Sequence, residues 1–151
     1  MKIVIGNDHA AVSMKKKIQS HLESKGYEVI NVGTDTEERC NYPEIAAAAC
    51  KKIQNGEAER GVLICGTGAG MAITANKLRG IRAVVCSEPV TARLAREHNH
   101  ANVICFGERV VGEEMGYAIV DAYLNAQELG DRHAMRVGLI SEIEEAESAG
   151  K

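Results

Sequence analysis

The sequence has few aromatic residues and no tryptophan. Phe, Trp and Tyr together make up 3% of the 151 residues, yet 45% of the residues are hydrophobic. The core must therefore consist mainly of Val, Ile, Leu, Ala and Met, as is typical of α/β proteins with buried parallel strands, and an all-β sandwich is disfavoured. A chain of this length is expected to form one domain, residues 1–151, without needing disulfides or a structural metal.

The sequence also lacks an excess of basic residues and long apolar segments. Lys and Arg total 18 against 21 for Asp and Glu, and the absence of a basic run argues against nucleic-acid binding. No apolar segment has the length of a signal-peptide core or of a membrane-spanning helix. We therefore expect a cytoplasmic protein that binds neither nucleic acid nor a membrane.

Closely spaced cysteine pairs are missing. The five cysteines are separated along the chain and include no CxxC pair, which argues against both a disulfide framework and a zinc site. Cys50, Cys86 and Cys105 lie inside apolar runs and are predicted to be small core residues. Although His98 and His100 form an HxH pair, they have no nearby Cys or carboxylate cluster, and no metal site is predicted.

Strand-like and helix-like segments alternate along the whole chain. A continuous apolar run such as Val62 to Ile64 is typical of a central strand that helices cover on both faces. The predicted strands are residues 2–5, 27–32, 61–65, 82–86 and 101–106, and the predicted helices include 91–98 and 113–126. A last helix is expected beyond Gly130, in a C-terminal region that starts near residue 131 and ends in a frayed acidic tail from Glu144.

This alternation predicts an α/β fold with right-handed crossovers. The expected architecture is a single open, doubly wound, five-stranded parallel sheet, a Rossmann-like αβα sandwich with strand order 2-1-3-4-5. In that order the chain reverses direction between the first and third strands, where ligands bind in such sheets. The segment Asn7-Asp8-His9 should therefore face the segment Cys65 to Gly70.

The glycine-rich segment Cys65-Gly66-Thr67-Gly68-Ala69-Gly70 joins a predicted central strand to a helix. Its main-chain amides can converge on an anion with help from the helix dipole. The alternative is a glycine-rich turn needed only for close packing. A dinucleotide site is disfavoured because the segment follows the third strand and lacks the last glycine of GxGxxG, and a Walker loop is excluded because no GK[ST] follows.

Cys65 is the candidate for proton transfer. It ends a strand immediately before a helix, where the dipole and nearby amides should lower the pKa of a thiol below about 8.5. The alternative is a buried apolar cysteine. His9 and His98 are candidates for acid–base work or phosphate contacts, or else are surface residues.

Two arginines of the last helix are candidate phosphate ligands. Arg132 and Arg136 are four residues apart, so they share a helix face, and Arg109 is a further candidate. Arginines at this spacing more often lie on a solvated helix face, so the spacing alone does not identify a site.

Taken together, several motifs resemble the ribose-5-phosphate isomerase B family over nearly the full length of the chain. That family also includes isomerases of allose 6-phosphate and galactose 6-phosphate. The motifs are Gly6-Asn7-Asp8-His9-Ala10, Asn41-Tyr42-Pro43, Cys65 to Gly70, Ala75-Asn76-Lys77, Gly80-Ile81-Arg82-Ala83, Glu97-His98-Asn99, Gly107 to Val111 and Arg132 to Val137.

The resemblance implies interconversion of ribose 5-phosphate and ribulose 5-phosphate through an enediolate, without a cofactor or metal. It makes Cys65 the base, and His98 with Thr67 the group that opens the sugar ring. It also implies a homodimer with active sites at the subunit interface, and it leaves open whether two dimers pair into a dimer of dimers. The remaining implied roles are oxyanion binding by the backbone of Gly66, Gly68, Ala69 and Gly70, hydroxyl binding by Asp8, Tyr42 and Asn99, and phosphate binding by His9, Arg109, Arg132 and Arg136.

Two positions depart from the pattern of the family. Asn41 stands where the family commonly has Asp, and Ala11 stands where a glycine is frequent. These departures leave the reaction type standing but leave the sugar open between five and six carbons. Two other hypotheses are a non-catalytic sensor of sugar phosphates and a nucleotide-binding domain.

Overall fold

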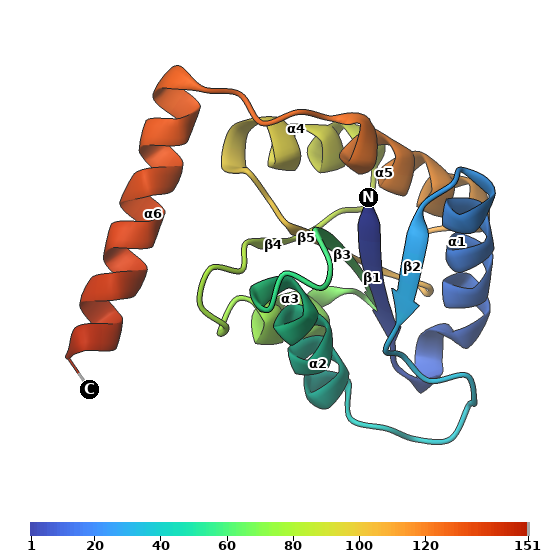
Figure 1. Cartoon of the computed structure of the whole chain (residues 1–151). Helices are drawn as coiled ribbons and strands as arrows, with labels where there is room; N and C mark the ends of the chain where they lie inside the picture. The colour runs from blue at the N-terminus through green and yellow to red at the C-terminus, as the bar shows by residue number, and fades with distance from the viewer. Residues whose placement is uncertain (151) are drawn as a thin grey trace.

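Short apolar runs form one parallel sheet in the computed structural model (Figure 1), which describes residues 1–150. Lys151, the last residue of the predicted domain, lies outside the described residues. All neighbouring strands in the sheet are parallel, as predicted. The strands are β1 (Lys2–Asn7), β2 (Glu28–Asn31), β3 (Arg60–Cys65), β4 (Ala83–Val85) and β5 (Val103–Gly107).

Helices cover both faces of the sheet, which confirms the predicted doubly wound architecture. One core cluster joins the sheet to α1, α4 and α5, and a second joins the opposite face to α2 and α3. The spacing of Met14, Ile18 and Leu22 buries one side of α1 against the sheet. The helices are η1 (His9–Ala11), α1 (Val12–Ser24), α2 (Tyr42–Gln54), α3 (Ala69–Ala75), α4 (Pro89–Asn99), α5 (Glu113–Asn125) and α6 (Asp131–Ala149).

The predicted strand order 2-1-3-4-5 is wrong, because the observed order is β2-β1-β3-β5-β4. Strand β5 lies between β3 and β4, and all five of its residues are buried. Strand β4 has only three residues, of which Val85 is 43% exposed. The longer and more apolar strand therefore occupies the inner position, and the shorter strand forms the edge.

The predicted frayed tail from Glu144 is also wrong, since α6 continues to Ala149. Glu and Ala dominate this stretch and both favour a helix. The Glu144 carboxylate accepts a hydrogen bond from the amide of Gly80 at 2.9 Å, which ties the end of α6 to the body of the protein. Figure 1 shows α6 at the side of the sheet, away from the two helix layers.

Three cysteines are core residues, as predicted. Cys50, Cys86 and Cys105 are each at most 2% exposed. Burial raises the pKa of Cys50 and of Cys86 to about 11, and it raises the pKa of Cys105 well above the ordinary value of a thiol. These thiols therefore stay protonated at neutral pH and are poor candidates for chemistry. Among the described residues, no helix is both long and apolar enough to span a membrane.

Arg60 stabilises the end of α5 from inside the protein. It is 6% exposed, and its guanidinium donates hydrogen bonds to the carbonyls of Tyr123 at 3.2 Å and Leu124 at 3.0 Å. We expect Arg60→Met to lower the free energy of unfolding by about 2–3 kcal/mol, because these buried carbonyls lose their donor. Thermal denaturation measures the effect. Arg93→Met is the control, because it breaks only the surface ion pair with Glu97 and should barely move the Tm.

Candidate active site

The carboxyl ends of β1 and β3 lie side by side. Asn7 is in register with Ile64, and the Asp8 amide donates to the Ile64 carbonyl at 3.3 Å. The prediction that residues 7–9 face the segment from Cys65 onward is therefore confirmed. Asp8 is buried, and its carboxylate accepts from the Ala10 amide at 3.0 Å, which caps η1 and fixes the position of the carboxylate.

The Cys65 thiol faces the glycine-rich loop. Its side chain is 5% exposed, and Sγ accepts a hydrogen bond from the Gly68 amide at 3.1 Å. The thiol is thus held against polar backbone, although it also borders the core that α2 and α3 form with the sheet.

Side chains and backbone from three other segments pack directly on the loop glycines. Gly68 has φ +83°, and a Cβ there would lie within 2.9 Å of the Phe106 backbone. A Cβ on Gly70 would lie 2.7 Å from the Tyr42 ring, and one on Gly66 would lie 3.2 Å from the Arg109 guanidinium. Gly68 therefore has to be glycine, and the close approach brings Tyr42 and Arg109 to the loop.

Some of the predicted anion-binding amides already have partners. The Gly68 amide is bonded to Cys65, and the Ala69 amide donates to the Thr67 hydroxyl at 3.3 Å. The Gly70 amide lies in the first turn of α3, where helix geometry provides no acceptor. Gly70 is thus the best placed of the predicted donors, while an oxyanion would have to displace the partners of Gly68 and Ala69.

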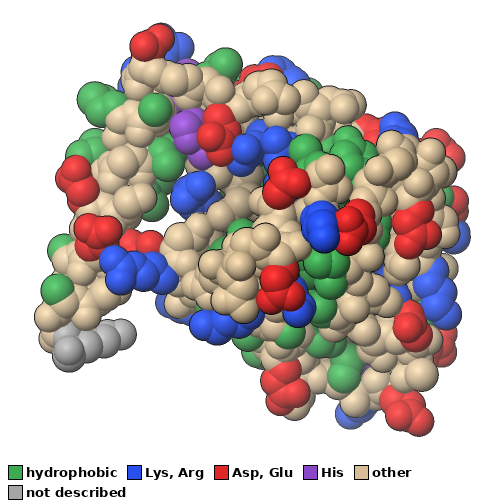
Figure 2. Space-filling view, viewed as in Figure 1, with side chains coloured by type: hydrophobic (Ala, Val, Ile, Leu, Met, Phe, Trp, Pro, Cys, Tyr) green, Lys and Arg blue, Asp and Glu red, His purple; other side chains and the backbone are tan. Residues whose placement is uncertain are grey.

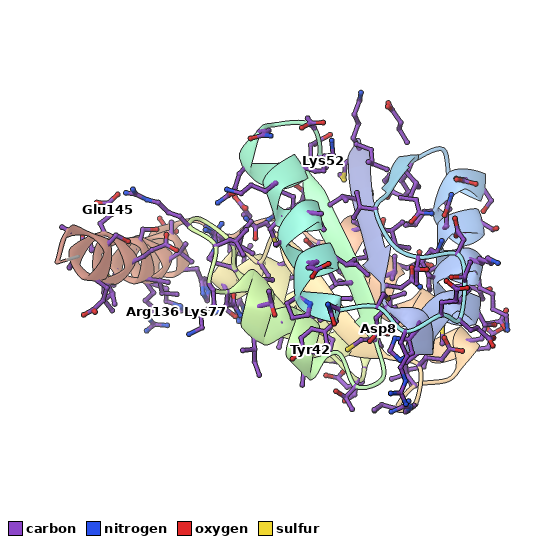
Figure 3. All side chains as sticks on the ribbon, turned by 90° about the horizontal axis from the view of Figure 1, so that it is seen from below. Asp8, Tyr42, Lys52, Lys77, Arg136 and Glu145 are labelled. Carbon is purple, nitrogen blue, oxygen red and sulfur yellow. The ribbon has the colours of Figure 1, made fainter. Side chains whose placement is uncertain are left out.

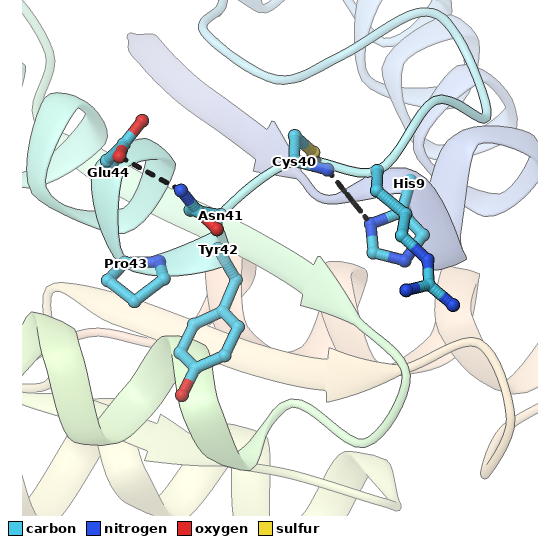
Figure 4. A pocket seen from close by; sticks show the side chains of 7 residues that line it. His9, Cys40, Asn41, Tyr42, Pro43 and Glu44 are labelled. Carbon is cyan, nitrogen blue, oxygen red and sulfur yellow. Dashed lines mark hydrogen bonds between the residues drawn. The ribbon is translucent and has the colours of Figure 1, made fainter.

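An open cavity of about 710 Å³ is lined by Tyr42, whose ring packs against Gly70 of this loop, but by no residue of the loop itself (Figure 4). His9 and Tyr42 line it together with Arg39, Cys40, Asn41, Pro43 and Glu44. Sequence reasoning missed Arg39 and Cys40, because they lie in an irregular polar segment whose periodicity carries no signal. Asn41, by contrast, was recognised as a departure from the family pattern, and its amide donates to the Glu44 carboxylate at 3.2 Å.

Four other predicted residues lie elsewhere in the chain. His98 and Asn99 end α4 just before β5, and β5 begins with Val103 in register with Gly61. Gly61 precedes Cys65 by four residues, or roughly 13 Å along a strand. Helix α4 packs on the face of the sheet that α1 and α5 also cover (Figure 1), and its last residues lie just before the start of β5, away from the carboxyl ends of the strands. Within one chain, His98 therefore lies apart from Thr67, so their predicted joint role stays a prediction that requires a partner subunit.

The arginines of α6 also lie away from the glycine-rich loop. Arg132 and Arg136 are exposed, and Figure 3 shows Arg136 near Lys77 and well away from Asp8 and Tyr42. Within one chain they do not join Arg109. The predicted site residues thus form a loop group (Asp8, His9, Tyr42, Cys65 to Gly70, Arg109) and a helix group (His98, Asn99, Arg132, Arg136).

His133 of α6 stacks on His98 of α4 and so joins the two helices that carry the helix group. Its ring stacks on that of His98, with centroids 4.2 Å apart and planes 8° from parallel. Desolvation, and then the positive charges of His98, Arg132 and Arg136, lower the pKa of His133. A neutral His133 can stack on His98 without repulsion. Sequence reasoning gave His133 no role, although it stands inside the arginine motif.

Residues 1–150 contain no group of three His, Cys, Asp or Glu side chains placed to hold a metal ion. The use of neither metal nor cofactor stays a prediction from the sequence. The chemistry assigned below requires only a base, hydrogen-bond donors and cations, and the two groups contain all three.

A comparison with known protein families matches the region that contains both groups of site residues. A family described as Ribose/Galactose Isomerase matches residues 3–140. The chain belongs to this family. The match spans both the loop group and the helix group, so the residues assigned from motifs lie inside the region that defines the family.

Individual family members match over almost the whole chain. Ribose-5-phosphate isomerase B of Escherichia coli (strain K12) is 51% identical over 144 residues, which are 95% of this chain and 97% of the relative. The structure of ribose-5-phosphate isomerase B from Clostridium thermocellum has a TM-score of 0.95 and 48% identity, and covers 97% of this chain and 99% of its own.

A third family member is described with a ligand. The structure of ribose-5-phosphate isomerase B from Mycoplasma genitalium with bound ribulose-5-phosphate has a TM-score of 0.91 and 36% identity, and covers 95% of this chain and 96% of its own. The Rossmann-like α/β fold with a parallel five-stranded sheet is thus the fold of these isomerases.

Proposed function

We propose that the protein interconverts ribose 5-phosphate and ribulose 5-phosphate through an enediolate. The observation that carries this proposal is the Cys65 thiol, whose sulfur accepts a hydrogen bond from a main-chain amide of the glycine-rich loop. Membership of the isomerase family and the near full-length likeness to ribose-5-phosphate isomerase B support it.

We assign one task to each group of residues. Cys65, as thiolate, removes the proton from C2 of the open-chain aldose and returns it to C1, while a proton moves between the oxygens on these carbons. The loop amides, with Gly70 best placed, stabilise the oxygen that becomes negative in the enediolate. Asp8, Tyr42 and Asn99 orient sugar hydroxyls, and His98 with Thr67 opens the ring.

Phosphate recognition is assigned to His9, Arg109, Arg132 and Arg136. Arginine provides charge-assisted, often paired hydrogen bonds to phosphate oxygens. Because Arg132 and Arg136 lie apart from the loop group within one chain, we propose that they reach the site of a partner subunit. His98 and Asn99 belong to the same helix group and would act across the interface with them.

The surface of α6 supports a homodimer with shared sites. Met135, Leu139, Ile140 and Ile143 are 61%, 49%, 48% and 66% exposed, and Figure 2 shows hydrophobic side chains along this helix. A hollow of about 590 Å³ separates α6 from Ile81 and Val84 of the body. An apolar helix of this kind is typical of a surface that a partner covers. Pairing of dimers and a cytoplasmic location also remain proposals.

Mixing inactive variants tests whether the sites are shared. Cys65→Ala and Arg136→Ala should each be nearly inactive alone. If Cys65 of one subunit works with Arg136 of the partner, random reassembly should restore about a quarter of wild-type activity, because half the dimers are hybrids and each has one intact site. Activity after co-refolding measures this. Failure of hybrids to regain activity, with hybrid formation verified by mass spectrometry, would place the arginine in the site of its own chain.

The function itself is tested by a substrate panel. We expect kcat/KM to be highest for ribose 5-phosphate among ribose, allose and galactose phosphates, since this ratio reports the binding of the transition state. A higher value for allose 6-phosphate or galactose 6-phosphate would support the six-carbon alternative. Asn41 lines the cavity, so Asn41→Asp measures how this departure affects the choice of sugar.

The non-enzymatic alternatives predict different outcomes. An isomerase incorporates solvent deuterium at C2 of the aldose phosphate, because its base exchanges protons with water. A sensor that binds the same sugar phosphate shows no incorporation. A nucleotide-binding domain would be stabilised against heat more by adenine nucleotides than by sugar phosphates.

A further inference from the structure

The main-chain amide of Cys40 contacts one nitrogen of the His9 ring. This amide donates a hydrogen bond to Nδ1 of His9 at 3.3 Å (Figure 4). A main-chain amide can only donate, so Nδ1 must accept and cannot itself carry a proton. A ring with an unprotonated Nδ1 is neutral and carries its hydrogen on Nε2.

The other ring nitrogen is available to a ligand. Within the described chain, every hydrogen bond of His9 goes to Nδ1, and none uses Nε2. His9 lines the cavity that also contains Arg39 and Tyr42. The Nε2–H group is therefore a donor without a protein partner on the wall of that cavity.

We propose that the Cys40 amide fixes His9 as the Nε2–H tautomer, so that His9 binds the phosphate of the substrate as a neutral hydrogen-bond donor. The inference rests on the proposed function for the identity of the ligand. Cys40 is then a positioning residue that acts through its main chain. Its thiol, 4.0 Å from the same Nδ1, is dispensable, and the positive charge on this wall comes from Arg39.

Nitrogen NMR measures the tautomer directly. In protein labelled with ¹⁵N-histidine, long-range proton–nitrogen correlation should show an unprotonated Nδ1 and a protonated Nε2 for His9. Loss of the signal in His9→Gln assigns it among the five histidines. An Nδ1–H tautomer, or averaging between the two tautomers, would overturn the inference. This result does not depend on activity, so it stands or fails separately from the proposed function.

Cys40→Ala separates the amide from the thiol. Alanine removes Sγ but keeps the main-chain donor, so the His9 nitrogen signals and the KM should stay within about twofold of wild type. A change of tautomer in Cys40→Ala would show that the thiol holds the ring and would refute the role of the amide.

Two substitutions of His9 separate the ring nitrogens in activity. Glutamine places its amide near the position of Nε2 and keeps a donor toward phosphate, whereas asparagine places it near Nδ1. We expect His9→Asn to raise KM about tenfold, the equivalent of one lost hydrogen bond, and His9→Gln to raise it less than about threefold. The kcat should change little in both. Equal losses in the two variants would contradict donation from Nε2.

Discussion

Replacement of Cys65 by alanine is expected to lower kcat by about 10³-fold or more while ribose 5-phosphate still binds. Proton transfer by a positioned side chain accounts for about 10²–10⁴-fold in rate, and Cys65 is the thiol that accepts a hydrogen bond from the loop. Rate measurements with titration calorimetry separate turnover from binding. Retained turnover would refute the assigned base.

Two controls keep this result interpretable. Cys65→Ser preserves an acceptor for the Gly68 amide but replaces a thiol with a hydroxyl that ionises far less readily, so it should fold normally and remain slow. Cys50→Ala removes a buried thiol from α2 and should leave the kcat of the folded protein unchanged. A serine variant with nearly full activity would mean that the thiolate is not required.

Among the variants proposed here, Gly107→Ala should lower the free energy of unfolding the most. An added Cβ would lie 2.4 Å from both the Gly66 carbonyl oxygen and the Thr67 Cα, so backbone would collide with backbone. Overpacking that no rotamer change can relieve should cost about 3 kcal/mol. For a chain of this size, that loss lowers the Tm by about 6–12 °C. The fraction that folds should also lose activity, because the displaced residues adjoin Cys65.

Gly112→Ala is the matched control for this substitution. Gly112 lies five residues further along the same connection, and an added Cβ there meets nothing within 4 Å. Gly112 is the N-cap residue of α5, so we expect Gly112→Ala to lower the free energy of unfolding by less than about 1 kcal/mol. If the two variants melted at the same temperature, the close approach of β5 to the loop would not be a stability determinant.

The elements could be predicted from local patterns, but their bounds and order could not. The periodicity that buries Met14, Ile18 and Leu22 identifies α1 without any tertiary information. The exchange of β4 and β5 was missed because both strands are apolar and both orders permit right-handed crossovers. Which of the two strands lies next to β3 depends on which one buries more of its surface there, and this is a property of the complete sheet.

The loop group could be predicted because its members follow strands that meet at one edge. Asp8 follows β1 and Cys65 ends β3, and the carboxyl ends of adjacent parallel strands lie together. The partners of His9 could not be predicted. Cys40 reaches the ring from 31 residues away through a segment without regular structure, and no periodic signal specifies the path of such a segment.

The sequence by itself determined the fold class, the buried thiols and the residue types that the reaction needs, because periodicity and motif spacing are local properties of the chain. The tertiary structure decided which of these residues meet. It placed Cys65 against the Gly68 amide and His98 against His133. The first pair lies at the carboxyl ends of the strands and the second lies near their amino ends. Helix α4 runs back along the sheet from the end of β4 to the start of β5, so its last residues cannot reach the carboxyl ends of the strands in the same chain.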